Sequence, residues 1–487
     1  MKKIFYFIVL SLLVMSCDDS KLDLEPLASV SESLVLNNPT DFENAVRGAY
    51  VYMYQRGGSS GYGGEFIIDT EVMTDNLIFS PQGRQTNLDG YRWTNTPNNT
   101  SFDYYESAYR PSEIASKVIN EIDRIPQNDF RDNLEGEARF VRALCHFDLV
   151  RSYSKIPTQS TDANSSLGVY YLDKFEPTFK PSRPTVADTY AKILNDLLLA
   201  KDLINSSNAG NSGRANLSAV YALLSRVYLY MGDYQNVVTY GNLAITSATG
   251  EMGTIATGAN FVGLWNDVNS SGVLFKLKID AGDGITPGVV FYQGVASARK
   301  SEFVVTKEFY NMFTPPVSVP VVTDTRKQAY IVTSNFAGKP YNHIIKYDGR
   351  VGGAASIVDI KVLRIEEVYL NLAEAEFKLN GGGLSYLDVL RSKRYTPFVS
   401  GNETGVALWN AIMKERRLEL AFEMDRFFTL KRLGLDMNRS DTDGHFADGT
   451  GTAATVTNVP AGDYRWQLPI PQYYRDLNPN YQQNPSY

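Results

Sequence analysis

Residues 221–245 read YALLSRVYLYMGDYQNVVTYGNLAI, and this stretch decides the expected architecture. Apolar side chains recur at helical spacing on both sides of residues 232–234, which predicts two amphipathic helices joined by a tight turn. A single helical hairpin of this kind cannot bury its apolar face alone. The stretch therefore predicts that several such units stack side by side into a helical scaffold.

The same hairpin has the spacing of a tetratricopeptide repeat. Tyr228, the Gly-Asp-Tyr turn and Ala244 stand where that repeat places packing residues, although Val237 replaces the usual small alanine. A second hairpin-like stretch, VYLNLAEAEFKLNGGG at 368–383, ends in glycines. We therefore expect a mainly α fold, built on a tetratricopeptide-like scaffold of helical hairpins.

Further helices are predicted before this hairpin. Apolar residues recur at helical spacing in 41–54, 104–124 and 134–153. In the segment RPTVADTY, Thr185 and Asp188 have the spacing of a capping box, which predicts the start of another helix.

Two long segments have a different character. Residues 55–101 are rich in Gly, Ser, Asn and Thr with scattered aromatics, which indicates long loops with short strands. Residues 250–360 hold Gly-, Pro- and Thr-rich loops around the strand-like runs VLFKLKI (273–279) and HIIKYD (343–348). Binding sites are commonly built from such loops on a rigid support. We expect a loop-rich, minor-β lobe that binds the ligand.

The N-terminus predicts export and lipid attachment. Lys2 and Lys3 precede the apolar run IFYFIVLSLLVM (4–15), which is shorter than the roughly 20 residues of a membrane-spanning helix. The order VMSC at 14–17 resembles a bacterial lipobox, so we expect residues 1–16 to be a lipoprotein signal peptide and Cys17 to carry the lipid. A chance cysteine after an ordinary signal peptide and an uncleaved anchor are the alternatives.

The rest of the chain divides into three parts. Residues 17–40 are polar and irregular, as expected of a lipidated tether. An N-terminal helical region with variable loops follows at 41–250, and a C-terminal region occupies 251–487.

Composition excludes some functions. The 487 residues are 43% hydrophobic, which is enough for a substantial core. The net charge of -7 argues against nucleic acid as a partner, because binding phosphates needs a basic face. Once Cys17 is acylated, Cys145 has no partner within the chain, so no intramolecular disulfide is expected.

Four blocks carry a resemblance to a known family. They are GEARFVRALCHFDLVRSYSKIP (136–157), VLRIEEVYLNLAEAEFKLNGG (362–382), MKERRLELAFEMDRFFTLKRLG (413–434) and LPIPQYYRDLNPNYQQNPSY (468–487). Their order resembles that in SusD/RagB-family lipoproteins, and with the lipobox and the hairpin it covers nearly the whole chain. The chain departs from the family pattern at Met424 and Ser486, where the family usually has glycine, at Thr429 (aspartate) and at Leu433 (tryptophan). Because of these departures, the sequence does not decide whether the C-terminal region packs locally as in other members of the family.

The resemblance implies a place and a partner. Members of this family are anchored in the outer membrane, and Asp18 and Asp19 resemble the acidic tract that directs some lipoproteins to the extracellular side. They bind glycan or peptide nutrients and cover a SusC-like TonB-dependent transporter. The same SusD-like fold and role are implied for this chain.

The charged residues of the blocks predict ion pairs rather than catalysis. Four of them fall on one stripe of alternating sign along an expected helix, namely Arg416, Glu419, Glu423 and Arg426. Glu366 and Glu367, like Glu374 and Glu376, are too close in sequence to point the same way from a helix. They do not converge on a substrate.

Two short motifs match catalytic patterns by spacing only. GGSSG at 57–61 matches G-x-S-x-G, but that motif needs a strand before the serine and a helix after it, whereas here a helix precedes and glycine follows. Ser297 and Lys300 match S-x-x-K without a companion motif. We interpret GGSSG as a loop and the S-x-x-K match as chance, and expect no enzymatic activity, with a surface hydrolase as a remote alternative.

Metal ligands do not cluster in the sequence. The three histidines lie far apart, and none has the i, i+4 partner of a helical zinc site: His146, His343 and His445. Asp441, Asp443 and Asp448 around Gly444 offer oxygen ligands for calcium, but the twelve-residue loop pattern is missing. We expect a solvated loop there and no metal or other cofactor.

Sugar binding needs aromatic rings and polar side chains rather than a catalytic group. A flat ring covers the C–H face of a pyranose, while Asn, Asp, Gln or Arg bind its hydroxyls. Trp409 and Trp466 lie beside the scaffold blocks and are expected in the core. The ligand-binding candidates from the loop-rich segments are Asp75, Asn76, Tyr91, Arg92, Trp93, Asn95, Trp265 and Tyr292. For each aromatic, burial in the core is an equally good interpretation.

We therefore expect a surface lipoprotein that captures oligosaccharide or polysaccharide and passes it to the transporter without turnover. Peptide capture is the alternative within the same architecture. A purely structural repeat protein is the alternative outside it.

Overall fold

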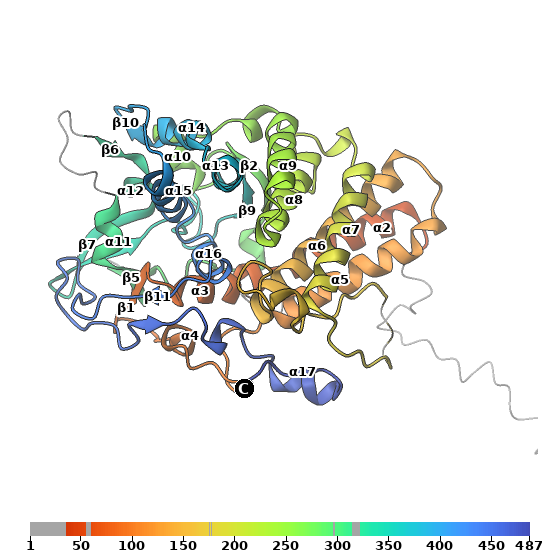
Figure 1. Ribbon diagram of the computed structural model, residues 1–487, viewed down its shortest axis with the longest axis horizontal. Helices are drawn as coiled ribbons and strands as arrows, with labels where there is room; N and C mark the ends of the chain where they lie inside the picture. Colours follow the sequence, from red (N-terminus) through yellow and green to blue (C-terminus); the bar gives the residue numbers. More distant parts are fainter. Residues whose placement is uncertain (1–35, 55–59, 175, 177, 296–297, 314–321) are drawn as a thin grey trace, which may run out of the picture.

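The computed structural model describes residues 36–54, 60–174, 176, 178–295, 298–313 and 322–487. The predicted signal peptide, Cys17, most of the tether, Ser297 and the greater part of GGSSG lie outside these residues. Helices dominate the described chain, and short strands pair beside them (Figure 1), which confirms the mainly α prediction.

The described helices include those predicted at 41–54, 104–124, 134–153 and after Thr185, and others besides. They are α2 Pro39–Tyr52, α3 Glu65–Val72, α4 Leu88–Arg92, α5 Tyr104–Glu121, α6 Asp129–Tyr153, α7 Val186–Leu203, α8 Leu217–Met231, α9 Tyr234–Ser247, α10 Gly258–Leu264, α11 Lys307–Met312, α12 Thr325–Tyr330, α13 Ile365–Asn380, α14 Leu384–Arg394, α15 Gly405–Glu419, α16 Arg426–Arg432 and α17 Gln472–Leu477.

The strands are short and pair antiparallel in twos. The pairs are β1 Leu77–Phe79 with β5 Phe303–Val305, β2 Val273–Leu277 with β9 Ile360–Arg364, β3 Gln293–Val295 with β4 Ala298–Lys300, β6 Thr323–Asp324 with β10 Tyr395–Thr396, β7 Ile331–Phe336 with β8 Lys339–Ile344, and β11 Met437–Asn438 with β12 Asn458–Val459. The first predicted strand, 273–279, is confirmed as β2. The second is correct only in part, because β8 ends at Ile344 and 345–348 are not in a strand.

The predicted hairpin is formed by α8 and α9. Gly232 ends α8 with φ 77°, a left-handed conformation that glycine adopts without steric cost. Asp233 then caps α9, because its side chain accepts a hydrogen bond from the backbone N of Asn236 at 3.2 Å. The rings of Tyr228 and Tyr240 stack across the hairpin with centroids 5.5 Å apart and an interplanar angle of 4°.

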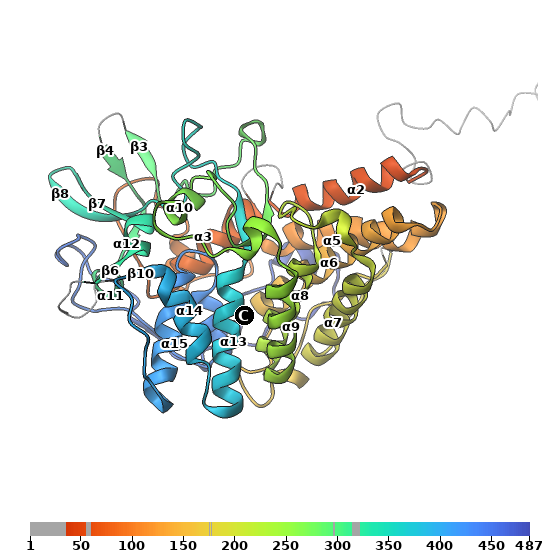
Figure 2. The same ribbon diagram turned by 90° about the horizontal axis from the view of Figure 1, so that it is seen from above.

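The hairpin belongs to a longer row of helices. Figure 2 shows α7, α8, α9, α13 and α15 side by side, and α5 and α6 continue the row. Helices α9 and α13 approach closely at Gly241, where an added Cβ would lie 2.7 Å from Leu372 Cδ2. This close approach therefore requires a glycine.

The start of α7 confirms the expected cap. Thr185 Oγ1 accepts a hydrogen bond from the backbone N of Asp188 at 3.0 Å, and the Thr185 hydroxyl donates to the Asp188 carboxylate at 2.7 Å. The two side chains thus bind each other, whereas a full capping box has the second side chain bound to backbone.

Helix α3 was not predicted. It lies within 55–101, which we interpreted as loops and short strands. All its residues from Phe66 to Val72 are buried, including the polar Asp69, Thr70 and Glu71, so the helix has no solvent-exposed face and its sequence shows no amphipathic period.

The expected single stripe in the third block is interrupted. Helix α15 ends at Glu419, α16 begins at Arg426, and Phe422 and Met424 between them have φ angles of 66° and 65°. The prediction of one continuous helix is wrong here. Met424, which replaces the usual glycine of the family, adopts the left-handed conformation that favours glycine.

The C-terminal residues return to the N-terminal helices. The backbone N of Leu468 donates to the Ser152 carbonyl at 3.2 Å. Asn484 Nδ2 donates to the Tyr153 carbonyl at 2.7 Å, and Asn484 Oδ1 accepts from Arg183 at 2.8 Å. Figure 1 shows the C-terminus beside α4 and α17 along the lower edge of the molecule.

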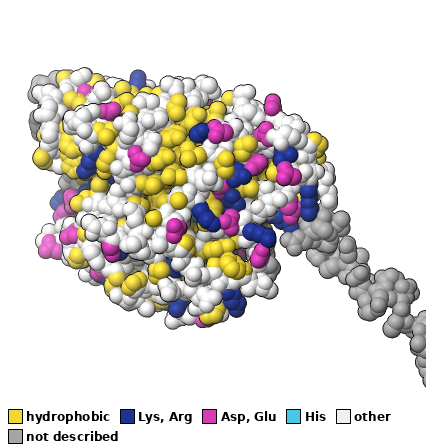
Figure 3. Space-filling view, turned by 45° about the vertical axis from the view of Figure 1, so that its right-hand side comes forward, with side chains coloured by type: hydrophobic (Ala, Val, Ile, Leu, Met, Phe, Trp, Pro, Cys, Tyr) yellow, Lys and Arg dark blue, Asp and Glu magenta, His cyan; other side chains and the backbone are white. Residues whose placement is uncertain are grey.

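The surface of the described residues carries mixed charge. In Figure 3, basic and acidic side chains are interspersed around a broad hydrophobic area, and on this face the basic ones do not form a continuous surface. Within the described ranges, no helix has both the length and the apolar character needed to cross a membrane.

Candidate functional site

Trp93 lies in the core rather than on the expected ligand-facing surface. It is 2% exposed, and its ring meets the ring of Trp466 edge-on with centroids 4.8 Å apart. Its Nε1 donates a hydrogen bond to the Met73 carbonyl at 3.1 Å. A ring enclosed in this way cannot cover the face of a sugar, so the expected stacking by Trp93 is wrong. Trp466 is buried as predicted.

The neighbours of Trp93 divide into buried and exposed residues. Tyr91 is buried beneath Arg439, whose Cζ lies 4.1 Å from the ring centroid. Asn95 is buried and accepts a hydrogen bond from the backbone N of Ser101 at 3.0 Å. Arg92 is exposed. Only Arg92 of these three candidates is accessible, whereas Tyr91 and Asn95 hold the loop in place.

Asp75 and Asn76 bind arginines of the C-terminal region. Arg426 donates two hydrogen bonds to the Asp75 carboxylate at 2.8 and 2.6 Å, and Arg417 Nε donates to Asn76 Oδ1 at 2.8 Å. Burial alone would raise the pKa of Asp75, but the charges of Arg417 and Arg426 prevail and lower it to about 2. Both candidates are buried. Their expected role as ligand contacts is therefore wrong, because they tie the segment after α3 to α15 and α16.

Trp265 is buried in a cation–π contact. It is 2% exposed, and Lys346 Nζ lies 3.8 Å from its ring centroid. Lys346 also donates to Glu423 Oε1 at 2.6 Å, and burial lowers the pKa of this lysine to about 8. Because the ring faces this buried ammonium group, the expected stacking of Trp265 on a sugar is wrong.

Tyr292 keeps part of its ring accessible. The residue is half-buried, and the Cζ of Arg299 lies 4.3 Å from the ring centroid. Arg299 Nη1 in turn donates to the Asp348 carboxylate at 2.6 Å. One face of the Tyr292 ring is thus covered by a fixed cation, and the side chain is held in one orientation.

Polar side chains from neighbouring loops gather beside Tyr292. The buried Glu302 accepts hydrogen bonds from Arg84 Nε at 3.2 Å and from the side chain of Gln293. Gln82 Nε2 donates to the Tyr341 hydroxyl at 3.2 Å. We call this region the loop surface, and it consists of Gln82, Arg84, Tyr292 and Arg299, with the buried Tyr341 beneath Gln82. Its residues other than Tyr292 were not predicted, because the contacts join segments far apart in sequence.

Trp409 is half-buried on α15, not in the core as expected. Its ring lies 5.3 Å from that of Phe377, and Lys378 Nζ lies 4.1 Å from its centroid. The N-terminal half of α15, just before the third block, therefore reaches the surface here.

No metal centre forms among the described residues, since no three His, Cys, Asp or Glu side chains gather as ligands. His146 Nε2 accepts a hydrogen bond from the backbone N of Leu172 at 2.8 Å, and burial lowers the pKa of His146 to about 3. His343 and His445 both lie against Tyr341, with ring centroids 5.7 and 6.0 Å from it. These contacts account for all three histidines.

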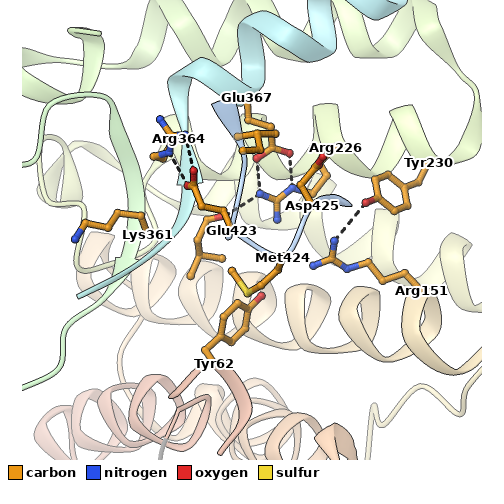
Figure 4. Close-up of a pocket in the computed structure, with 12 residues that line it drawn as sticks. Tyr62, Arg151, Arg226, Tyr230, Lys361, Arg364, Glu367, Glu423, Met424 and Asp425 are labelled. Atoms are coloured by element: carbon orange, nitrogen blue, oxygen red, sulfur yellow. Dashed lines mark hydrogen bonds and ion pairs between the residues drawn. The ribbon is translucent and has the colours of Figure 1, made fainter. Parts of the chain in front are cut away.

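Figure 4 shows a closed, charged cavity near the segment between α15 and α16. Its volume is about 20 Å³, which is room for about one water molecule. Arg226 donates to the Glu367 carboxylate at 2.7 and 2.5 Å, and Arg364 Nε donates to Glu423 at 2.7 Å. The cavity is too small for a ligand, and its charges neutralise one another.

The paired carboxylates of the second block do not converge, as predicted. Arg394 Nη2 donates to Glu366 at 2.9 Å, whereas Arg432 donates to Glu374 at 2.6 Å. Glu367 binds a third arginine in the cavity of Figure 4. Three of the four carboxylates are thus held by arginines, and the fourth, Glu376, accepts a hydrogen bond from Asn380 Nδ2 at 2.7 Å.

Family comparisons match two long parts of the chain. A family described as starch-binding and associating with the outer membrane matches residues 22–229. The SusD family matches residues 288–487.

Individual relatives cover nearly the full length. The SusD-like protein P2 of Formosa agariphila is 23% identical over 99% of this chain and 99% of its own. Among solved structures, a SusD superfamily protein of Bacteroides thetaiotaomicron is similar with a TM-score of 0.79 and 25% identity, over 92% of this chain and 100% of that one. A SusD superfamily protein of Bacteroides vulgatus has a TM-score of 0.76 and 26% identity, over 93% and 100% of the two chains.

Proposed function

Because the chain belongs to the SusD/RagB family, we propose that it is a surface-exposed lipoprotein that captures oligosaccharide or polysaccharide and delivers it to a SusC-like TonB-dependent transporter. The observation that carries the proposal is the pair of family matches, which together take in most of the chain and include the starch-binding description. The full-length likeness to SusD superfamily structures supports it.

The proposed activity is binding without turnover. The family is one of binding proteins. The charge distribution supports this view, because the buried carboxylates of the conspicuous blocks are held by arginines, as in the Arg226–Glu367 and Arg432–Glu374 pairs. A general acid or base needs a carboxyl group that reaches a substrate.

Among the candidates taken from the sequence, Tyr292 and Arg92 remain as proposed ligand contacts. Tyr292 offers part of a ring that Arg299 holds in place, and Arg92 is exposed on α4. Both are polar groups carried by a rigid support, which suits recognition of sugar hydroxyls.

Binding is tested with the chain that starts at Asp18, which retains every described residue. We expect heat of binding with at least one soluble polysaccharide or oligosaccharide series in isothermal titration calorimetry, and no released product after prolonged incubation. Product release that is lost on replacing a single acidic residue would contradict the non-catalytic proposal. A copurified peptide, with no affinity for any glycan, would place the protein among peptide-capturing members instead.

The lipid anchor is tested separately. Cys17 lies outside the described residues, and Asn38 caps the first described helix. In cells of the source organism or a related bacterium, Cys17→Ala is expected to release a folded, ligand-competent protein from the membrane fraction, because the acyl chains supply the membrane affinity. A Ser16→Ala variant, which keeps the cysteine, serves as the matched control and should stay in that fraction. Retention of Cys17→Ala would contradict the anchor.

Delivery to a transporter is tested by copurification. A tagged form of this lipoprotein, extracted in mild detergent, is expected to bring a TonB-dependent barrel with it. Its absence under conditions that preserve other outer-membrane complexes would count against the transporter.

A further inference from the structure

An open groove lies on the side of the molecule away from the loop surface. It runs between α5, the described residues of 170–174, 176 and 178–181, and residues 474–481, and its volume is about 470 Å³. Figures 1 and 2 place α5 on the right of the molecule and the strands near the loop surface on the left. The volume falls within the range of about 300–1,000 Å³ that is usual for small-molecule sites. We call it the tyrosine groove.

Tyrosine rings form the floor of the tyrosine groove. Tyr105 and Tyr474 stack with centroids 4.7 Å apart and an interplanar angle of 27°. Tyr109 lies 4.8 Å from Tyr105, and Tyr481 meets Tyr105 edge-on at 6.0 Å. The result is a continuous aromatic surface made by both ends of the sequence.

Hydrogen bonds between these tyrosines and the backbone fix the floor. The Tyr109 hydroxyl donates to the Tyr170 carbonyl at 2.8 Å, and the backbone N of Tyr170 donates to the Tyr481 hydroxyl at 3.2 Å. The wall is tied as well, because Asn478 Nδ2 donates to the Pro181 carbonyl at 2.8 Å. A floor held in this way is preorganised, so ligand binding would not need to order it.

The outer aromatic groups of the groove are accessible. Phe179 is 55% exposed, and its ring lies 5.9 Å from that of Tyr170. Tyr170 and Tyr474 are half-buried. The exposed part of the Phe179 ring does not pack in the core. Together with the partly exposed Tyr170 and Tyr474 it offers a flat apolar surface to a ligand.

The charges around the groove set the kind of ligand. Its charged residues are three carboxylates and two cations, namely Glu106, Glu113, Glu176, Arg110 and Lys174. Arg110 pairs with Glu113 at 3.0 Å, and Lys174 pairs with Glu176 at 2.7 Å. The lining is therefore slightly acidic overall. It offers donors and acceptors for hydroxyl groups but no excess positive charge for sulfate or uronate groups.

We propose that the tyrosine groove is a second carbohydrate site, which holds a neutral oligosaccharide by stacking sugar rings on Tyr474 and Phe179. The inference rests on the proposed carbohydrate-binding function. The flat C–H faces of pyranose rings cover the aromatic groups, while the paired charges of the rim bind the hydroxyls. With two sites on opposite sides, the protein can hold one polysaccharide chain at two points, which raises the overall avidity. It can also hold two separate chains.

The test uses the chain from Asp18 and neutral oligosaccharides of the malto, cello, xylo, manno and laminari series, each titrated by calorimetry. Phe179→Ala and Tyr474→Ala are expected to weaken binding of the recognised series at the groove by at least about fivefold. Phe179 is exposed, so its replacement leaves the fold intact. Phe130→Ala is the matched control, because Phe130 is also an exposed phenylalanine, 43% accessible, outside the groove.

The outcomes separate the groove from the proposed function. If the unaltered protein binds a glycan and both groove variants bind it with the same affinity and stoichiometry, the groove proposal is overturned and the proposed function stands. If the unaltered protein binds none of these neutral series, the groove proposal is overturned, and the proposed function fails only if charged glycans and polysaccharides do not bind either. Equal loss in Phe130→Ala would overturn the site, and binding of a proline-rich peptide in place of glycans, sensitive to the same two variants, would overturn the ligand class.

Discussion

Arg432 and Glu374 form a bidentate ion pair between α16 and α13. Both terminal nitrogens of Arg432 donate to the Glu374 carboxylate at 2.6 Å, and the side chains are 2% and 0% exposed. The residues come from two of the sequence blocks that first indicated the family. The charges of these blocks therefore join the scaffold helices to one another.

Glu374→Gln is expected to lower the free energy of unfolding by about 3–5 kcal/mol, because it leaves the Arg432 charge buried without a partner. The measurement is urea denaturation followed by circular dichroism. Arg47→Gln breaks an exposed pair with Glu43, in which Arg47 is 64% accessible. This control should change the same quantity by at most about 1 kcal/mol. Similar small changes in both variants would contradict a structural role for the buried pair.

Three buried carboxyl groups are expected to lower the stability of the folded state as the pH rises from about 5 to 9, against smaller opposite contributions from the buried His146 and Lys346. Burial raises the pKa of Glu65 and Glu71 to about 8 and that of Asp69 to about 7. The folded state therefore binds more protons than the unfolded chain above pH 4, and raising the pH disfavours it. Asp75 acts oppositely: its pKa of about 2 gives stability above its unfolded pKa that is lost as the pH falls toward 2. Urea midpoints from about pH 2 to pH 9 check the loss of stability at both the acidic and the basic end.

Glu71→Gln isolates one of these groups. The Glu71 Oε1 accepts a hydrogen bond from the backbone N of Met424 at 2.9 Å, and a glutamine oxygen can accept the same bond without a charge. At pH 9 we expect the variant to exceed the unaltered protein in stability by about 1–3 kcal/mol, with little difference at pH 5. Glu251→Gln at an exposed position is the control and should shift neither value. A gain that is equal at both pH values would show that ionisation is not its cause.

Ser486→Gly is expected to stabilise the protein slightly. Ser486 is exposed and has a φ angle of 74°, a left-handed conformation that costs non-glycine residues about 1–2 kcal/mol. Part of this gain is offset by the greater flexibility of glycine in the unfolded chain, which leaves about 0.5–1 kcal/mol. Ser486→Ala keeps the backbone cost and should give no gain. Equal melting temperatures for the two variants would refute the argument from backbone strain.

Trp93→Ala is expected to destabilise the fold by about 3–5 kcal/mol, because it opens a cavity beside Trp466 and removes a buried hydrogen bond. The glycan affinity of the folded fraction should stay the same. Thermal unfolding and calorimetry on one sample distinguish the two effects. Weakened binding with an unchanged melting temperature would restore Trp93 as a ligand contact.

The helical scaffold was predictable from the sequence. Whether each loop residue is buried or exposed was not. The α8–α9 hairpin follows from local spacing. Helix α3 was missed because it is buried on all sides and its polar residues do not alternate with apolar ones at helical spacing. Trp93 stands among polar residues in the sequence, and contacts with Met73 and Trp466 decide its burial. Such contacts join distant segments, so the sequence alone does not reveal them.

The tyrosine groove illustrates the same limit. The segments YYESAY (104–109) and YYRDLNPNY (473–481) are visibly rich in tyrosine. Only the return of the C-terminus to α5 brings them together, with Tyr105 stacked on Tyr474. The tyrosine content of both segments is visible in the sequence. Their contact in the folded protein is not.

The bond between Asn484 and the Tyr153 carbonyl imposes an order of events on a chain made from its N-terminus onward. Helix α6 is synthesised long before the groups that complete its C-terminal end, Leu468 and Asn484. Long-range closure of this kind is slow compared with helix formation. The last turn of α6 therefore lacks these two hydrogen-bond donors until the segment that contains Leu468 and Asn484 has been made and has folded back onto it.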